Sequence, residues 1–189
     1  HPDLMAIGKG ITGGYLPLAA TVANERVYQA FLGEDLSERT LYHGHSYSGN
    51  PLAAAVALAH LELFTSLEVL ANVNERATQL EQLLDQHIAG LPAVRSIRQQ
   101  GLMVGVELAP PEGTVRWGRK VTAESVSRGV LIRPLGDVMV LMPILTSTPD
   151  EITRIVMTLA ESISAVAQTE QQYLKASQVE NSQDHAAHE

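Results

Sequence analysis

The sequence predicts an α/β protein in two parts, the second of them a smaller α+β part. Short apolar runs that end in glycine, typical of buried strands, alternate with segments of helical periodicity. A long amphipathic segment, residues 66–90, separates the two parts and can link them. The chain has 189 residues, of which 45% are hydrophobic. This is enough for one full core or two modest ones.

The first part, residues 1–65, begins with two apolar segments that we interpret as strands, at 3–8 and 16–24. Asn24 then has the position of an N-cap. The helix that follows it is expected to run for about two turns and to end at Gly33.

A second helix is predicted to begin at Asn50 and Pro51. Asparagine caps helix N-termini, and proline suits the first helical position. This helix runs to Phe64 and is apolar on nearly every face, so we expect it to be buried. The next helix, 66–90, carries leucines at helical spacing with charged residues between them, and Gly90 ends it.

The second part, residues 91–168, again mixes strands and helices. Strands are predicted at 94–100, 102–108, 129–135 and 138–145, and helices at 117–128 and 149–167. Gly101 and the Gly136–Asp137 pair mark turns between neighbouring strands. The last segment, residues 169–189, is polar and is expected to be disordered.

Charge and composition limit the partners. A formal net charge of −8 argues against nucleic acid or an anionic membrane, because either would need a basic face. There is neither a long apolar run nor a signal-peptide pattern, so we expect a cytoplasmic protein. The absence of cysteine excludes a thiolate nucleophile and a zinc–thiolate site. A strand begins almost at once after His1, and we therefore expect that the chain is cut from a longer one.

Lys9 is the first candidate functional residue. It lies between two glycines, which let the backbone approach a ligand closely and adopt angles that other residues avoid. A lysine amine with a lowered pKa is a nucleophile toward aldehydes. The same pattern also fits a surface lysine in an ordinary tight turn, so both interpretations stay open.

A second candidate is the loop at residues 42–51. Ser46 and Ser48 precede a helix whose free N–H groups favour phosphate, although both can be ordinary loop residues. His43 and His45 are two residues apart, as in some metal sites. We expect no metal here, because catalytic zinc needs three protein ligands and no third is evident.

The third candidate is Arg133, which follows an apolar strand and precedes a proline. Its guanidinium could bind a substrate carboxylate with two parallel hydrogen bonds. Alternatively, it pairs with a neighbouring acidic side chain at the edge of a sheet.

Three segments, taken in order, resemble the class III aminotransferases, which are fold-type I enzymes that use pyridoxal phosphate. They are PDLMAIGKGITGGYLPLAA (2–20), HGHSYSGNPLAAAVAL (43–58) and RGVLIRPLGDVMVLMP (128–143). The resemblance covers residues 2–167. It implies the C-terminal part of that fold, with the remainder of the large α/β domain at 1–65, a linking helix at 66–90 and a small α+β domain at 91–168.

The resemblance also assigns roles to residues. It implies that Lys9 bonds covalently to pyridoxal phosphate and later moves a proton as general base and acid. Ser46 matches a threonine whose hydroxyl reaches the cofactor phosphate of the neighbouring subunit, and Gly44 and His45 would line the same shared site. Arg133 matches an arginine that holds a substrate carboxylate. We therefore expect a homodimer that acts on a small-molecule amino donor and keto acceptor.

Within the family, TGGYLPL, HSYSGNP and IRPLG most resemble members that convert 8-amino-7-oxononanoate to 7,8-diaminononanoate in biotin biosynthesis. The expected donor is S-adenosylmethionine, or lysine as in a variant of that activity. One departure is Ile144, where a second proline is usual, and we expect a local change beside the pocket.

Two alternatives remain. The first is another class III activity, on ornithine, 4-aminobutyrate or glutamate-1-semialdehyde. The second is a non-catalytic truncated paralogue that associates with a full-length partner. In the family, the groups that hold the pyridine nitrogen, the phosphate and the ring face lie upstream of Lys9. We therefore expect this chain alone to bind cofactor poorly, to be weakly active or inactive, and to leave apolar helix surface uncovered.

Overall fold

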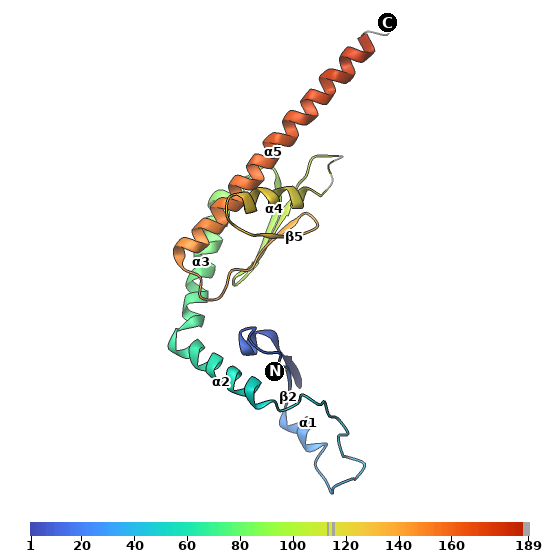
Figure 1. The fold of residues 1–189 in the computed structure, drawn as a ribbon, viewed down its shortest axis with the longest axis vertical. Coiled ribbons are helices and arrows are strands. Elements are labelled where there is room, and N and C mark those ends of the chain that lie inside the picture. The colour runs from blue at the N-terminus through green and yellow to red at the C-terminus, as the bar shows by residue number, and fades with distance from the viewer. Residues whose placement is uncertain (113, 115, 187–189) are drawn as a thin grey trace. The chain divides into compact units, whose positions relative to one another are not determined.

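The chain folds into two compact units, His1–Val69 and Leu70–Glu189 (Figure 1). The computed structural model describes residues 1–112, 114 and 116–186, with side chains described as far as Gln172. Each unit has its own antiparallel sheet. In the described part of the chain no single helix is both long and apolar enough to cross a membrane. Only the helices α2 (Pro51–Ser66) and α3 (Val69–His87), taken together, reach that length and composition.

The first unit is built on a short pair of strands. Its elements are β1 (Leu4–Ile7), the 3-10 turn η1 (Lys9–Thr12), β2 (Ala20–Ala23), α1 (Glu25–Gln29) and α2 (Pro51–Ser66). β1 and β2 are antiparallel, with Leu4 opposite Ala23. β2 is shorter than the predicted segment, in which Pro17 has no N–H to donate to a sheet. Asn24 caps α1 as predicted, because its Oδ1 accepts a 3.0 Å hydrogen bond from the Val27 N–H.

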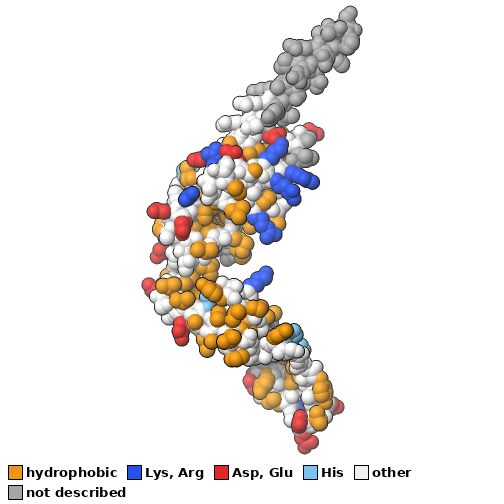
Figure 2. Space-filling view, in the orientation of Figure 1, with side chains coloured by type: hydrophobic (Ala, Val, Ile, Leu, Met, Phe, Trp, Pro, Cys, Tyr) orange, Lys and Arg blue, Asp and Glu red, His pale blue; other side chains and the backbone are white. Residues whose placement is uncertain are grey.

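Helix α2 begins where the sequence predicts and is covered less than expected. Asn50 Oδ1 accepts a 3.0 Å hydrogen bond from the Leu52 N–H, and a proline occupies the first turn. Only Ala53 and Ala57 of this helix are buried, whereas Leu58 is 63% exposed. The burial expected from the apolar pattern is therefore wrong for this chain, whereas the uncovered apolar helix surface that we expected for this chain alone is present. Figure 2 shows hydrophobic side chains gathered over it.

The second unit is a four-stranded antiparallel sheet with three helices. Its elements are α3 (Val69–His87), β3 (Val94–Gln100), β4 (Met103–Leu108), α4 (Trp117–Ser127), β5 (Arg133–Leu135), β6 (Val138–Leu141) and α5 (Pro149–Ala186). The strand order is β3-β4-β6-β5. β5 begins later than predicted, at Arg133 instead of Gly129. β6 ends earlier than predicted, at Leu141, since Pro143 has no N–H to extend the ladder.

The core of the second unit draws on all three helices and the sheet. Its fully buried members include Leu80, Leu84, Val106, Trp117, Val121, Met139, Ile152, Val156 and Ile163. Helix α3 thus supplies core side chains from Leu80 to Ile88, just beyond its end. The predicted linking segment is therefore a core helix of this unit.

The start of α4 is held against the β5–β6 turn. The Asp137 carboxylate accepts a 2.9 Å hydrogen bond from the Gly118 N–H. A Cβ added to Gly118 would collide with the Gly136 carbonyl oxygen and lie 3.1 Å from Pro134 Cβ. Only glycine permits this close approach of helix and turn.

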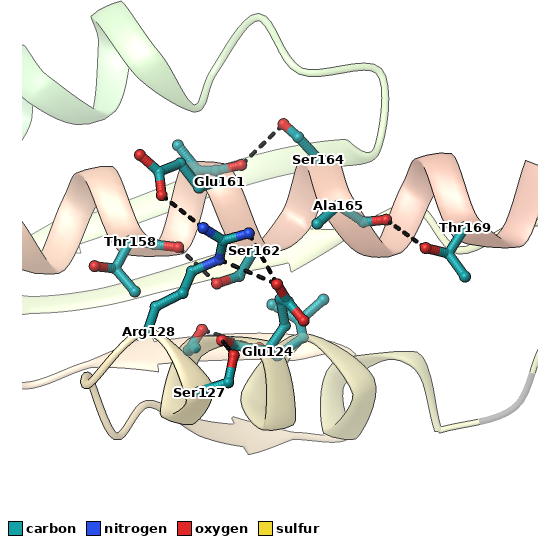
Figure 3. Close-up of polar contacts among 12 residues, drawn as sticks. Glu124, Ser127, Arg128, Thr158, Glu161, Ser162, Ser164, Ala165 and Thr169 are labelled. Carbon is teal, nitrogen blue, oxygen red and sulfur yellow. Dashed lines mark hydrogen bonds and ion pairs between the residues drawn. The ribbon is translucent and has the colours of Figure 1, made fainter.

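Helix α5 packs against α4 and continues far beyond its predicted end. Arg128 at the end of α4 pairs with Glu124 at 2.8 Å and with Glu161 of α5 at 3.0 Å (Figure 3). We expected α5 to end near Ala167 and a disordered tail to follow. That expectation is wrong as far as Ala186, because no glycine or proline interrupts a segment rich in Gln, Glu and Ala. Residues 187–189 of the predicted tail lie outside the described residues.

Candidate functional site

Lys9 is the first residue of η1, directly beyond β1. Its φ is +49°, a left-handed value that is uncommon for a residue other than glycine. Its side chain is exposed and forms no ion pair with any described residue. The structure therefore presents a free amine on a turn whose backbone is strained by about 1 kcal/mol or more.

Backbone hydrogen bonds and one buried side chain fix the shape of this turn. Gly13 N–H donates to Gly10 O at 3.2 Å, and Tyr15 N–H donates to Thr12 O at 3.2 Å. Thr12 is 1% exposed, and its hydroxyl donates to Leu16 O at 2.6 Å. The backbone that carries Lys9 is thus a hydrogen-bonded turn and not an irregular loop.

His60 of α2 lies against this turn, and the sequence analysis missed it. A Cβ added to Gly13 would be 2.9 Å from His60 Cδ2. The contact joins residues far apart in the sequence. The only local signal was that His60 and Glu62 are polar residues within a largely apolar helix.

The loop before α2 carries Gly44, His45 and Ser46, all exposed. His45 shapes it, because its carbonyl accepts a 2.9 Å hydrogen bond from Ser48 N–H and its Nδ1 accepts one of 3.2 Å from Tyr47 N–H. The Ser46 hydroxyl faces solvent just before the N-terminus of α2. Among the described residues no group of three or more His, Cys, Asp or Glu side chains could hold a metal ion.

The acidic residue nearest to Lys9 on its N-terminal side is already engaged. The Asp3 carboxylate pairs with Arg26 at 2.8 Å and accepts a hydrogen bond from Asn24. Both of these contacts are made by Asp3 Oδ1. The first unit offers a free amine at Lys9 and a free hydroxyl at Ser46, which fit an aldehyde and a phosphate respectively.

Arg133 lies in the second unit, as the first residue of β5. It pairs with Val140 in the sheet, and its side chain is exposed without an ion pair to the described residues. The alternative of an arginine paired with a neighbouring acid is therefore not seen. Its guanidinium is free to bind a carboxylate through two hydrogen bonds.

A cavity of about 400 Å³ opens beside β5 and β6 in the second unit. Val140 and Met142 line it, together with Arg154 of α5. Ile144, the departure noted in the sequence, also lines it and is 69% exposed. Most lining residues are apolar, and the polar side chains among them are Ser147, Glu151 and Arg154.

The chain matches known proteins along most of its length. The family model for aminotransferase class-III matches residues 1–163. Adenosylmethionine-8-amino-7-oxononanoate aminotransferase of Nitratidesulfovibrio vulgaris is 45% identical over 88% of this chain and 32% of that protein. The protein of the same name from Aquifex aeolicus is 45% identical over 86% of this chain and 37% of that protein.

The structural comparison agrees. The crystal structure of adenosylmethionine-8-amino-7-oxononanoate aminotransferase from Methanocaldococcus jannaschii matches with a TM-score of 0.80 and 38% identity, over 87% of this chain and 39% of that chain. The expected fold is thereby confirmed as part of a longer fold. The chain spans between 32% and 39% of the length of these relatives.

Proposed function

This chain belongs to the aminotransferase class-III family, and from that premise we propose that Lys9 bonds pyridoxal phosphate in a transaminating enzyme. The observation that carries the proposal is the Lys9 amine, which is exposed, without an ion-pair partner among the described residues, and held on a fixed left-handed turn. An amine presented in this way can bond to an aldehyde without first breaking an ion pair.

The residues of the proposed site bind the cofactor and orient the substrate. The cofactor, when bound, supplies the electron sink for the reaction. Lys9 Nζ holds the cofactor and, once displaced by the amino donor, moves a proton at the substrate carbon. The Ser46 hydroxyl donates to the phosphate of the neighbouring subunit in a homodimer, while Gly44 and His45 line the shared site.

We propose 8-amino-7-oxononanoate as the acceptor and 7,8-diaminononanoate as the product. Relatives at up to 45% identity that carry the corresponding name support this choice. Arg133 would hold the acceptor carboxylate, since its guanidinium is exposed and has no ion pair with described residues. The amino donor is S-adenosylmethionine or lysine. Because the chain spans about a third of its relatives, we also propose that full activity needs residues beyond it.

The first test asks whether Lys9 bonds the cofactor. Because we expect the chain alone to bind the cofactor poorly, it is incubated with excess pyridoxal phosphate, and borohydride reduction then makes the bond irreversible. The product is digested, and mass spectrometry locates the modified lysine. We expect the label at Lys9, and its loss in Lys9→Ala. Lys120→Ala is the matched control, because Lys120 is also partly exposed but pairs with Glu170. Labelling that does not depend on Lys9 would overturn the proposal.

The second test concerns the substrate and uses the whole protein that contains this chain. Its rate with 8-amino-7-oxononanoate is compared with its rates on ornithine, 4-aminobutyrate and glutamate-1-semialdehyde. We expect 8-amino-7-oxononanoate to be preferred, and Arg133→Lys to raise KM for it more than it lowers kcat. A preference for one of these other substrates would assign the protein a different activity within the family.

A further inference from the structure

The turn that carries Lys9 has left-handed backbone at both ends. Lys9 has a φ of +49°, and Gly13, which ends η1, has a φ of +60°. Glycine adopts this conformation freely, whereas the backbone at Lys9 is strained and persists only where surrounding structure holds it in place. The question is therefore which side chain of this unit holds the turn.

His60 of α2 is the side chain that meets Gly13. A Cβ on Gly13 would lie 2.9 Å from His60 Cδ2 and 3.1 Å from Nε2, so the imidazole ring fills the space that a side chain would need. Phe64, one helical turn on, meets the same ring edge-to-face with the ring centroids 5.0 Å apart. The imidazole thus contacts both the turn and Phe64.

The ring acts by packing and not through a hydrogen bond at its buried nitrogen. His60 Nδ1 is buried and has no hydrogen-bond partner among the described residues. Polarity at this position therefore gives the turn no support that an apolar ring would lack. Ala53 and Ala57, which precede His60 at helical spacing and so share its face, are also buried, whereas several leucines of the helix are exposed.

We propose that His60 is a positioning residue for Lys9, because its ring packs against Gly13 and holds the left-handed turn that presents the amine. The purpose of this support rests on the proposed function of Lys9. The contact itself does not, and it can be tested separately.

The test of the contact is residue-resolved hydrogen exchange in the whole chain, read at the turn amides of Ile11, Gly13 and Tyr15. His60→Ala is expected to speed exchange there by about tenfold, because a packed ring is replaced by a void. His60→Phe is expected to restore wild-type exchange. Leu61→Ala is the matched control, since Leu61 is the next residue of the helix and is 54% exposed.

The test of positioning is the rate at which Lys9 is labelled by pyridoxal phosphate and borohydride, with the label at Lys120 as internal reference. We expect His60→Ala to lower the ratio of Lys9 to Lys120 labelling by about tenfold, in parallel with the loss of exchange protection. His60→Phe should restore the ratio, because phenylalanine keeps a packed ring. If the imidazole nitrogens were needed, His60→Phe would not restore it.

Gly13→Ala gives a second route that does not need His60→Ala to fold well. With His60 present, the new methyl meets the ring. With His60→Ala, only the backbone cost of a left-handed alanine remains. The effect of Gly13→Ala on turn exchange should therefore be smaller in the His60→Ala background, a non-additivity that a double-mutant cycle measures.

Two results would overturn the proposal: unchanged turn exchange in His60→Ala, or additive effects of Gly13→Ala and His60→Ala. Failure of the proposed function would give a different result from failure of this proposal. In that case the wild-type chain itself is not labelled at Lys9, while the exchange measurements still report whether His60 holds the turn.

Discussion

At the scale of single residues, the candidate site places the amine of Lys9 on a backbone conformation that is unfavourable for lysine. Lys9 adopts a left-handed conformation that an L side chain disfavours, whereas Gly8 before it is extended, with φ −173° and ψ −164°. Natural proteins keep such strain where it serves a function. Stability and reactivity at Lys9 should therefore respond to substitution in different ways.

Two substitutions at Lys9 separate these effects. Lys9→Gly and Lys9→Ala both remove the amine, so both should abolish labelling by pyridoxal phosphate. Glycine tolerates a φ of +49° and alanine does not, so Lys9→Gly should be more stable than Lys9→Ala by about 1 kcal/mol. Urea unfolding followed by circular dichroism measures the difference. Equal stabilities would show that the left-handed turn does not persist in solution.

Glu107 in the second unit makes the stability of the fold depend on pH, and the direction of its pKa shift gives the sign of that dependence. The pKa of Glu107 is lowered, first by the hydrogen bond from the Ser96 hydroxyl at 2.9 Å and also by Arg95 at 3.1 Å. These contacts favour the charged form, so their stabilising effect is present above the unfolded pKa and is lost as pH falls through the folded pKa.

Ser96→Ala should therefore raise the pKa of Glu107 toward its ordinary value and flatten the acid side of the stability curve. Carboxyl chemical shifts followed by NMR titration measure this pKa directly. Ser127→Ala is the control, because Ser127 bonds only to a backbone carbonyl of α4. An unchanged Glu107 pKa in Ser96→Ala would contradict the assignment.

At the scale of elements, the signals that succeeded were local and those that failed depended on distant parts of the chain. Asn24 and Asn50 were predicted as caps because a cap needs only the next few residues. The burial of α2 depends on what covers it, which its own sequence does not specify. For the same reason, the packing of His60 on Gly13 could not be foreseen, since it joins two elements far apart in the sequence.

The junction of α4 with the β5–β6 turn offers a sharp test at this scale. Gly118→Ala places a methyl group against the Gly136 carbonyl oxygen, so it should destabilise the second unit by about 1–3 kcal/mol. Gly90→Ala is the control, because no atom lies within 4 Å of a Cβ there. The fluorescence of Trp117, the only tryptophan, reports unfolding beside the substituted residue. Equal midpoints for the two variants would contradict the close packing.

At the scale of the whole molecule, this chain carries a candidate cofactor-binding lysine in one unit and a candidate carboxylate-binding arginine in the other. The sequence predicted both residues, and the three resemblance segments contain them. What sequence alone could not give is the extent of each unit, since α3 joins the core of the second and α5 continues through a polar tail. The polar composition of the last segment indicated disorder, whereas its residues favour helix and no glycine or proline stops α5 before Ala186.

The exposed leucines of α2 lead to a prediction about the chain in solution. Leu52, Leu58 and Leu61 are 70%, 63% and 54% exposed, and an apolar surface of this kind favours association between copies. We expect the average mass in sedimentation experiments to rise with concentration, and Leu58→Gln combined with Leu61→Gln to suppress the rise. Leu131→Gln is the control, because Leu131 is 84% exposed but lies in the second unit. A monomeric wild-type chain at all concentrations would show that α2 is covered in solution.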